Sequence, residues 1–184
     1  QNVRLMNKKI IVAIDLSNLK KAINLVKALK SEVYAFKIGH EFFYNFGIEG
    51  YKKIYNICPK IFLDLKLHDI PNTCSSAIKA IKDLRVNYLT IHISSGLEAL
   101  KAAKKVSGKI KLVGVTTLTS LDNKNLKEIG YNKSVKNLII HQSKLAQKAK
   151  LDALVCDGKS VKYVKKKFKK EIITPGIRFN NNKN

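Results

Sequence analysis

The chain has 184 residues, of which 45% are hydrophobic, and a formal net charge of +23 from 36 Lys and Arg against 13 Asp and Glu. This length suits one domain with a sizeable core, and we expect a single domain over residues 1–184. The longest early apolar run, residues 10–14, is too short for a membrane span or a secretory signal. The three cysteines (Cys58, Cys74 and Cys156) lack C-x-x-C spacing. They argue against a zinc site or a disulfide framework and predict a reducing, cytoplasmic setting.

Seven apolar segments of strand length alternate with segments of helical periodicity. The expected strands cover residues 10–15, 34–39, 61–66, 88–94, 111–117, 153–156 and 172–175. Helices are expected near residues 19–29, 42–57, 77–84 and 134–150. A further helix is expected after the fourth strand, ending near Gly108 as a C′ residue. Such alternation is typical of a parallel sheet covered by helices, either a doubly wound sheet or a (β/α)8 barrel.

The ends of the predicted strands favour the barrel. No glycine fingerprint follows the first strand, which argues against a dinucleotide-binding fold. Charged or hydroxyl side chains end many of the strands: Asp15, Lys37, Asp64 with Lys66, His92 with Ser94, and residues 116–119. Because a barrel gathers all its strand ends around one mouth, we predict an α/β (β/α)8 TIM barrel whose eighth βα unit is missing from this chain.

Both ends of the sequence are unusual. Met6 comes shortly before the first expected strand, so residues 1–5 are expected to be a non-native or upstream extension. Residues 180–184 read Asn-Asn-Asn-Lys-Asn, and no strand or helix pattern closes the chain. We therefore expect the domain to be incomplete at its C-terminus.

Residues 61–73 are the most informative segment. At period 2, Asp64 and Lys66 point to the same side of the strand, and Asp69 follows shortly after. This places a carboxylate, an ammonium and a second carboxylate at the end of an otherwise apolar strand. An amphipathic strand with one solvated face is the plain alternative.

The excess of basic residues could instead indicate nucleic-acid binding, with residues 162–170 as the best candidate patch. However, Val161, Val164 and Phe168 fall at helical spacing inside that run. Its lysines are therefore interpreted as the solvated side of a packed helix.

Five segments carry a resemblance to a known family: VAID at 12–15, FKIG at 36–39, IFLDLKLHDIPNT at 61–73, VTTLTS at 115–120 and TPGIR at 174–178. In this order they make the chain resemble bacterial orotidine 5′-phosphate decarboxylase over residues 10–178. The resemblance implies decarboxylation of orotidine 5′-phosphate to UMP in de novo pyrimidine synthesis, with no cofactor and no metal. It also implies a homodimer with shared active sites, and neither a nucleic-acid nor a membrane partner.

The resemblance also implies roles for particular residues. Lys66 would stabilise and protonate the carbanion, and Asp64 would lie near the substrate carboxylate and hold Lys66 in register. Two nearby carboxylates favour the ammonium form of Lys66. The implied catalytic residues are Lys66, Asp64, Asp69 and Lys37. The implied substrate-binding residues are Asp15, Lys37, Ile70, Thr73, Thr119, Pro175, Gly176 and Arg178. His68 and His92 are interpreted as structural hydrogen-bonding residues.

Two alternatives stay open. Metal-dependent relatives with the same barrel act on sugar phosphates and carry a glutamate at the position of Lys37, where an ammonium would repel a cation. The family's remaining phosphate-binding residues, a glutamine and a Gly-Arg pair, are absent from this chain. It could therefore also be an inactive remnant with a basic nucleic-acid-binding surface.

Overall fold

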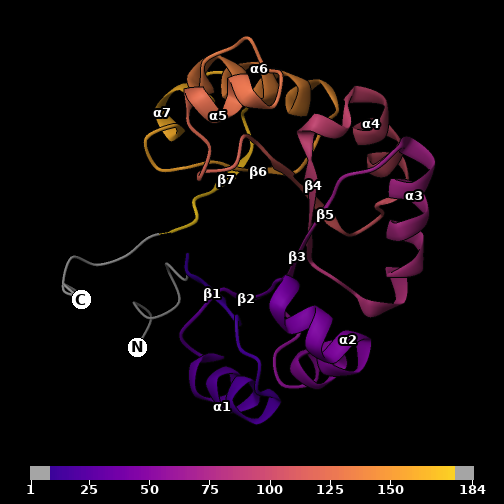
Figure 1. Ribbon diagram of the computed structural model, residues 1–184. Coiled ribbons are helices and arrows are strands. Elements are labelled where there is room, and N and C mark those ends of the chain that lie inside the picture. The colour runs from indigo at the N-terminus through magenta and orange to yellow at the C-terminus, as the bar shows by residue number, and fades with distance from the viewer. Residues whose placement is uncertain (1–8, 177–184) are drawn as a thin grey trace, which may run out of the picture. The chain divides into compact units, whose positions relative to one another are not determined.

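The computed structural model describes residues 9–176 (Figure 1). The expectations for residues 1–5, for Arg178 and for the Asn-rich tail lie outside the described residues. The described chain forms two compact units. Unit 1 holds the residues up to Leu65 together with Ala80–Thr90, and unit 2 holds Lys66–Lys79 together with the residues from Ile91 onward.

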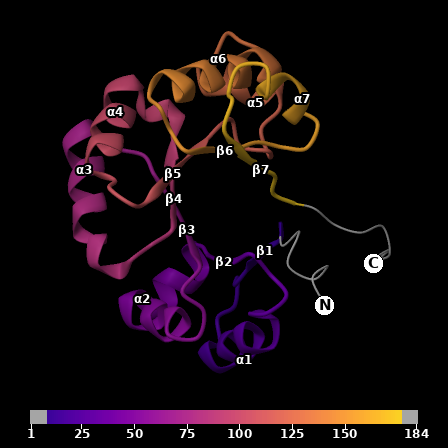
Figure 2. The ribbon, with the colours of Figure 1, turned by 180° about the vertical axis from the view of Figure 1, so that it is seen from behind.

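Unit 1 contains the first strands and helices. In chain order these are β1 (Ile11–Ala13), α1 (Leu19–Leu29), β2 (Ala35–Ile38), α2 (His40–Tyr55), β3 (Ile61–Leu67) as far as Leu65, η1 (Lys82–Leu84), and β4 (Tyr88–His92) as far as Thr90. β2 pairs in parallel with both β1 and β3. The helices α1 and α2 contact each other and lie side by side in both views (Figures 1 and 2). The apolar residues Phe36, Ile38 and Leu63 are fully buried and make these strands the core of the unit.

Unit 2 begins in the last residues of β3. It contains α3 (Pro71–Ala80) up to Lys79, the end of β4, η2 (Ile93–Ser95), α4 (Leu97–Val106), β5 (Lys111–Val115), α5 (Asn123–Glu128), α6 (Val135–Lys148), β6 (Ala153–Val155), α7 (Val161–Val164) and β7 (Glu171–Ile173). β6 pairs in parallel with both β5 and β7. In both views α5, α6 and α7 gather beside β6 and β7 (Figures 1 and 2).

Local sequence signals explain where several helices begin and end. The Asn18 side chain accepts a hydrogen bond from the Lys21 amide at 2.9 Å and caps α1. Asp122 and Asn125 form a reciprocal capping box at the start of α5. Gly108 follows the α4 C-cap with a φ of +55°, as predicted for a C′ glycine.

The seven predicted strands are all present, and most are shorter than expected. β4 ends at His92 because the chain turns into the 3-10 helix η2. The helix over residues 161–168 is also shorter, since α7 ends at Val164, although Val164 and Phe168 are buried as predicted. α5 was not predicted: with six residues, it is too short to show a helical period. No helix within residues 9–176 is long and apolar enough to cross a membrane.

Candidate functional site

A chain of alternating charges lies at the strand ends of unit 1. The Lys37 Nζ atom lies 3.5 Å from Asp15 Oδ1 and 3.5 Å from Asp64 Oδ2. The exposed fractions of the three side chains are 53% for Asp15, 25% for Lys37 and 11% for Asp64. The ammonium therefore links an open carboxylate to a nearly buried one, and burial strengthens the second pair relative to the first.

The strand register explains this convergence. Lys37 on β2 pairs with Ala13 of β1 and with Phe62 of β3. Each aspartate comes two residues after the partner of Lys37 on its own strand, because Asp15 follows Ala13 and Asp64 follows Phe62. Side chains two residues apart on a strand share a face, so parallel pairing brings both carboxylates toward the Lys37 side chain.

Thr90 is a member of this group that sequence reasoning missed. Its hydroxyl donates a 3.0 Å hydrogen bond to Asp64 Oδ1, and the residue is fully buried in β4. Each oxygen of Asp64 thus has a partner, Thr90 on one and Lys37 on the other. The one signal in the sequence is a hydroxyl residue inside an apolar strand, and threonine is common in strands for other reasons.

Gly39 leaves room for the Lys37–Asp15 pair. A Cβ atom at this position would lie 3.1 Å from Lys37 Nζ and 3.3 Å from Asp15 Oδ1. These separations are tighter than ordinary contacts, so a side chain at residue 39 would press on the ion pair. The glycine in the FKIG segment therefore has a steric role.

Lys66 lies on β3 two residues after Asp64, and its backbone is unusual. Its φ is +47°, whereas strand residues are normally near −120°. The alternation of side chains at period 2, which predicted that Asp64 and Lys66 share a face of the strand, therefore does not by itself fix the direction of the Lys66 side chain. The preceding carbonyl, that of Leu65, is 3.1 Å from the Nε2 atom of His40 at the start of α2.

Asp69, Ile70 and Thr73 form an exposed segment of unit 2 where α3 begins. Asp69 Oδ1 accepts a 2.7 Å hydrogen bond from the adjacent Ile70 amide, just before α3 begins, and Ile70 is 65% exposed. The Cys74 thiol, one turn into α3, donates to the Asp69 carbonyl, and burial raises the pKa of this thiol.

The His68 Nε2 atom lies 3.4 Å from the Ser94 hydroxyl oxygen and the His68 ring is 4.9 Å from that of His92, which fits a structural role for His68.

Three predicted substrate-binding residues, Thr119, Pro175 and Gly176, line one cavity of unit 2, of about 870 Å³. The neighbouring Thr116 hydroxyl donates to the Val155 carbonyl at 2.8 Å, and the Thr117 hydroxyl donates to Gln142 Oε1 at 3.1 Å. Thr119 is exposed beside them. Arg178, the fourth residue predicted in this part, lies outside the described residues.

The lining of this cavity also includes a polar cluster that was not predicted. Asp157 Oδ2 accepts a 2.5 Å hydrogen bond from the Ser160 hydroxyl, which also bonds to the Tyr163 hydroxyl. Lys136 Nζ lies 5.8 Å from the centre of the Tyr163 ring, in cation–π range. Lys136 and Lys159 both line the cavity, so its wall carries two ammonium groups and one carboxylate.

Comparison with known proteins gives consistent results. A family model described as "Orotidine 5′-phosphate decarboxylase / HUMPS family" matches residues 8–184. The chain is 44% identical over 180 residues to orotidine 5′-phosphate decarboxylase of Ehrlichia chaffeensis, covering 95% of this chain and 78% of that protein. It is 45% identical over 176 residues to orotidine 5′-phosphate decarboxylase of Buchnera aphidicola subsp. Acyrthosiphon pisum, covering 92% of this chain and 75% of that protein.

Solved structures agree on the fold. The crystal structure of orotidine 5′-phosphate decarboxylase from Lactobacillus acidophilus matches with a TM-score of 0.84 at 32% identity, covering 94% of this chain and 82% of that one. The enzyme from Methanocaldococcus jannaschii complexed with the inhibitor BMP matches with a TM-score of 0.80 at 24% identity, covering 96% and 81% of the two chains. The predicted fold class, an α/β fold of the (β/α)8 barrel type, is confirmed, and residues 9–176 supply one sheet of seven strands in chain order. The chain belongs to the orotidine 5′-phosphate decarboxylase / HUMPS family.

Proposed function

We propose that the protein decarboxylates orotidine 5′-phosphate to UMP without a cofactor. The observation that carries this proposal is the position of Lys37, whose ammonium lies 3.5 Å from both Asp15 and Asp64. Metal-dependent members of the superfamily are expected to have a glutamate here to help hold a cation. A fixed ammonium between the two carboxylates supplies the positive charge itself, and it would oppose a metal ion at the same place.

The reaction requires stabilisation of a carbanion. When the bond between C6 of the pyrimidine and the carboxylate breaks, carbon dioxide leaves and the electron pair stays on C6. A preorganised cation near C6 lowers the energy of this charge, and a proton from the same group completes the product. Lys66 is assigned both tasks: its ammonium donates a proton to C6, and the resulting amine is protonated again by solvent.

The carboxylates and Lys37 organise this reaction. Asp64 is held by Thr90 and Lys37, so its charge has a set position two residues before Lys66 on β3. We assign Asp64 to the substrate carboxylate, and Lys37 and Asp15 to the ribose hydroxyls. Asp15 is half exposed and can accept hydrogen bonds from a ligand.

The remaining assignments concern the exposed segment at the start of α3 and the residues that line the cavity of unit 2. Asp69, Ile70 and Thr73 are assigned to the active site of a partner subunit, which makes the protein a homodimer with shared sites. Ile70 is 65% exposed, so its side chain is accessible to a partner subunit. Thr119, Pro175 and Gly176 are assigned to the nucleotide, with Arg178 on its phosphate.

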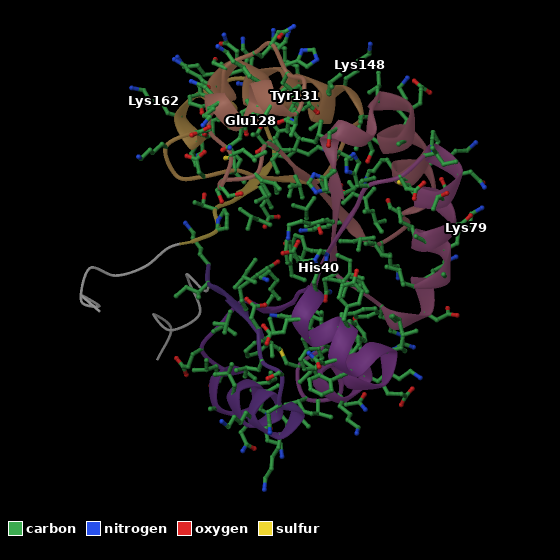
Figure 3. The ribbon with its side chains drawn as sticks, viewed as in Figure 1. His40, Lys79, Glu128, Tyr131, Lys148 and Lys162 are labelled. Atoms are coloured by element: carbon green, nitrogen blue, oxygen red, sulfur yellow. The ribbon has the colours of Figure 1, made fainter. Side chains whose placement is uncertain are left out.

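The test is turnover of orotidine 5′-phosphate by the chain and by its Lys66→Ala variant. Turnover should fall by several orders of magnitude in K66A while the circular dichroism spectrum is unchanged, because both the cation and the proton donor are removed. Lys79→Ala is the matched control, since Lys79 is exposed on α3 (Figure 3). Full activity in K66A would refute the mechanism.

A second measurement separates this proposal from the metal-dependent alternative. Turnover of orotidine 5′-phosphate should persist in excess EDTA. An absolute requirement for Mg²⁺, with activity on a sugar phosphate, would instead place the protein among the metal-dependent members of the family.

Sedimentation equilibrium tests the homodimer, and a monomer at all concentrations would remove the shared-site assignment of Asp69, Ile70 and Thr73.

A further inference from the structure

The backbone of Lys66 differs from the other left-handed residues of the protein. Within residues 9–176, three non-glycine residues have positive φ: Lys66, Arg85 and Lys150. Arg85 is the C-cap of η1, and Lys150 directly follows the C-cap of α6. Left-handed residues are usual at such helix ends. Lys66 instead lies inside β3, where an extended conformation is the stable one, so other groups must hold it in place.

His40 provides such a hold on the peptide that precedes Lys66. Its Nε2 atom lies 3.1 Å from the carbonyl oxygen of Leu65. A carbonyl can only accept, so the Nε2 atom of His40 carries the proton and donates. The φ angle of Lys66 is the rotation about its N–Cα bond, which joins this same peptide to the Lys66 Cα atom. Fixing the direction of the Leu65 carbonyl therefore limits the rotation that would return Lys66 to an extended conformation.

His40 is itself well placed for this task. It is the first residue of α2 and follows Gly39, the residue that leaves room for the Lys37–Asp15 pair. One turn later, the Tyr44 ring packs 5.5 Å from the imidazole at an angle of 35°. Figure 3 shows His40 at the N-terminal end of α2. One short segment, residues 37–40, thus contacts β3 through two side chains, Lys37 on Asp64 and His40 on Leu65.

We propose that His40 is a positioning residue for Lys66: it holds the Leu65 carbonyl so that Lys66 keeps its left-handed backbone and its ammonium keeps its place at the substrate. This inference rests on the proposed role of Lys66. His40 does not touch the reacting atoms in this scheme, and its effect is on the geometry of proton donation and charge stabilisation. Loss of the hydrogen bond should therefore lower kcat and leave KM nearly unchanged.

The kinetic test compares three variants. His40→Ala should lower kcat by about two- to tenfold, the rate equivalent of one hydrogen bond, with KM within about twofold. His40→Gln keeps a side-chain N–H donor and should restore much of the rate. His141→Ala is the matched control, because His141 is exposed on α6, and it should behave as the unmodified chain. Equal loss in H40A and H40Q, or no loss in H40A, would overturn the proposal.

A spectroscopic test does not depend on turnover. With ¹³C-carbonyl Leu and ¹⁵N-Lys, a carbonyl–nitrogen correlation detects only Leu-Lys peptides, at residues 19–20, 29–30, 65–66, 100–101 and 126–127. The other four pairs lie in helices or at a helix end, so the strand pair 65–66 is distinguishable. Its signal should move in H40A and stay near its original position in H40Q and H141A. An unmoved signal in H40A would overturn the proposal even in an active enzyme. A moved signal in a chain without decarboxylase activity would support the hold on Lys66 while refuting the proposed function.

Discussion

At the scale of single residues, the Asp64 carboxylate depends on its partners. Its side chain is 11% exposed, and it is held by the Thr90 hydroxyl at 3.0 Å and the Lys37 ammonium at 3.5 Å. A carboxylate removed from water is costly unless charges or hydrogen bonds replace the lost hydration. The carboxylate that we propose for the substrate site and the stability of unit 1 therefore depend on the same contacts.

Replacing Lys37 by methionine should show this dependence. The free energy of unfolding should fall by about 1–3 kcal/mol at neutral pH, because Asp64 loses its cation while remaining largely buried. Urea denaturation measures the change. Lys20→Met on the exposed face of α1 is the control and should lie within about 0.5 kcal/mol of the unmodified chain. If K37M were as stable as K20M, the pair with Asp64 would contribute nothing to folding.

A second residue-scale prediction concerns pH. Burial, and then the nearby Asp157 carboxylate, raise the pKa of the Cys156 thiol from 9.0 to about 11. Between these two values the unfolded chain releases a proton that the folded chain keeps, so the free energy of unfolding should fall as pH rises through this window. Urea denaturation between pH 8 and pH 10.5 should show a steeper loss for the unmodified chain than for Cys156→Ala. Parallel curves for the two proteins would contradict the assignment.

At the scale of elements, Asp152 joins three parts of unit 2. It comes just before β6, and its Oδ2 atom accepts from the Lys104 ammonium of α4 at 2.6 Å and from the Leu112 amide of β5 at 2.9 Å. Its own amide donates to the Leu112 carbonyl at 3.0 Å. The edge where β5 and β6 begin is thus held to α4 by one half-buried carboxylate.

Asp152→Ala should therefore destabilise the protein by about 1–3 kcal/mol, since the Leu112 amide loses its acceptor. Asp152→Asn keeps an acceptor oxygen and should cost less. Asp83→Ala, at an exposed position in η1, serves as the control in thermal or urea denaturation. Equal stability of D152A and D83A would mean that water replaces the carboxylate at no cost.

At the scale of the whole molecule, the net charge of +23 is spread over many exposed lysines. Lys79, Lys148 and Lys162 belong to three different helices and all are exposed (Figure 3). Within the basic run 162–170, some lysines serve the fold: the Lys170 ammonium donates to the carbonyls of Lys150 and Leu151, just after the end of α6. The lysines thus lie mostly in solvent, and some of them bind backbone carbonyls at a helix end.

Nucleic-acid binding by this surface should accordingly be weak and electrostatic. Binding of duplex DNA at low ionic strength should be lost at about 0.2 M salt, because each phosphate contact adds to the salt dependence. Fluorescence anisotropy of a labelled duplex measures it. Tight binding that persists at about 0.2 M salt would favour the alternative of a basic nucleic-acid-binding protein.

Sequence alone determined the alternation of seven strands with helices, and it predicted that Lys37, Asp64 and Asp15 meet at the strand ends, as their ion pairs show. These signals are local: apolar periodicity, and charged residues where an apolar run stops. The sequence did not reveal Thr90, which lies 26 residues after Asp64, or His40, which lies 25 residues before Leu65. A threonine in a strand and a histidine at a helix start are ordinary by themselves. Only the pairing of the strands and the placement of α2 against β3 bring them to the site, because contacts between distant segments depend on register and packing.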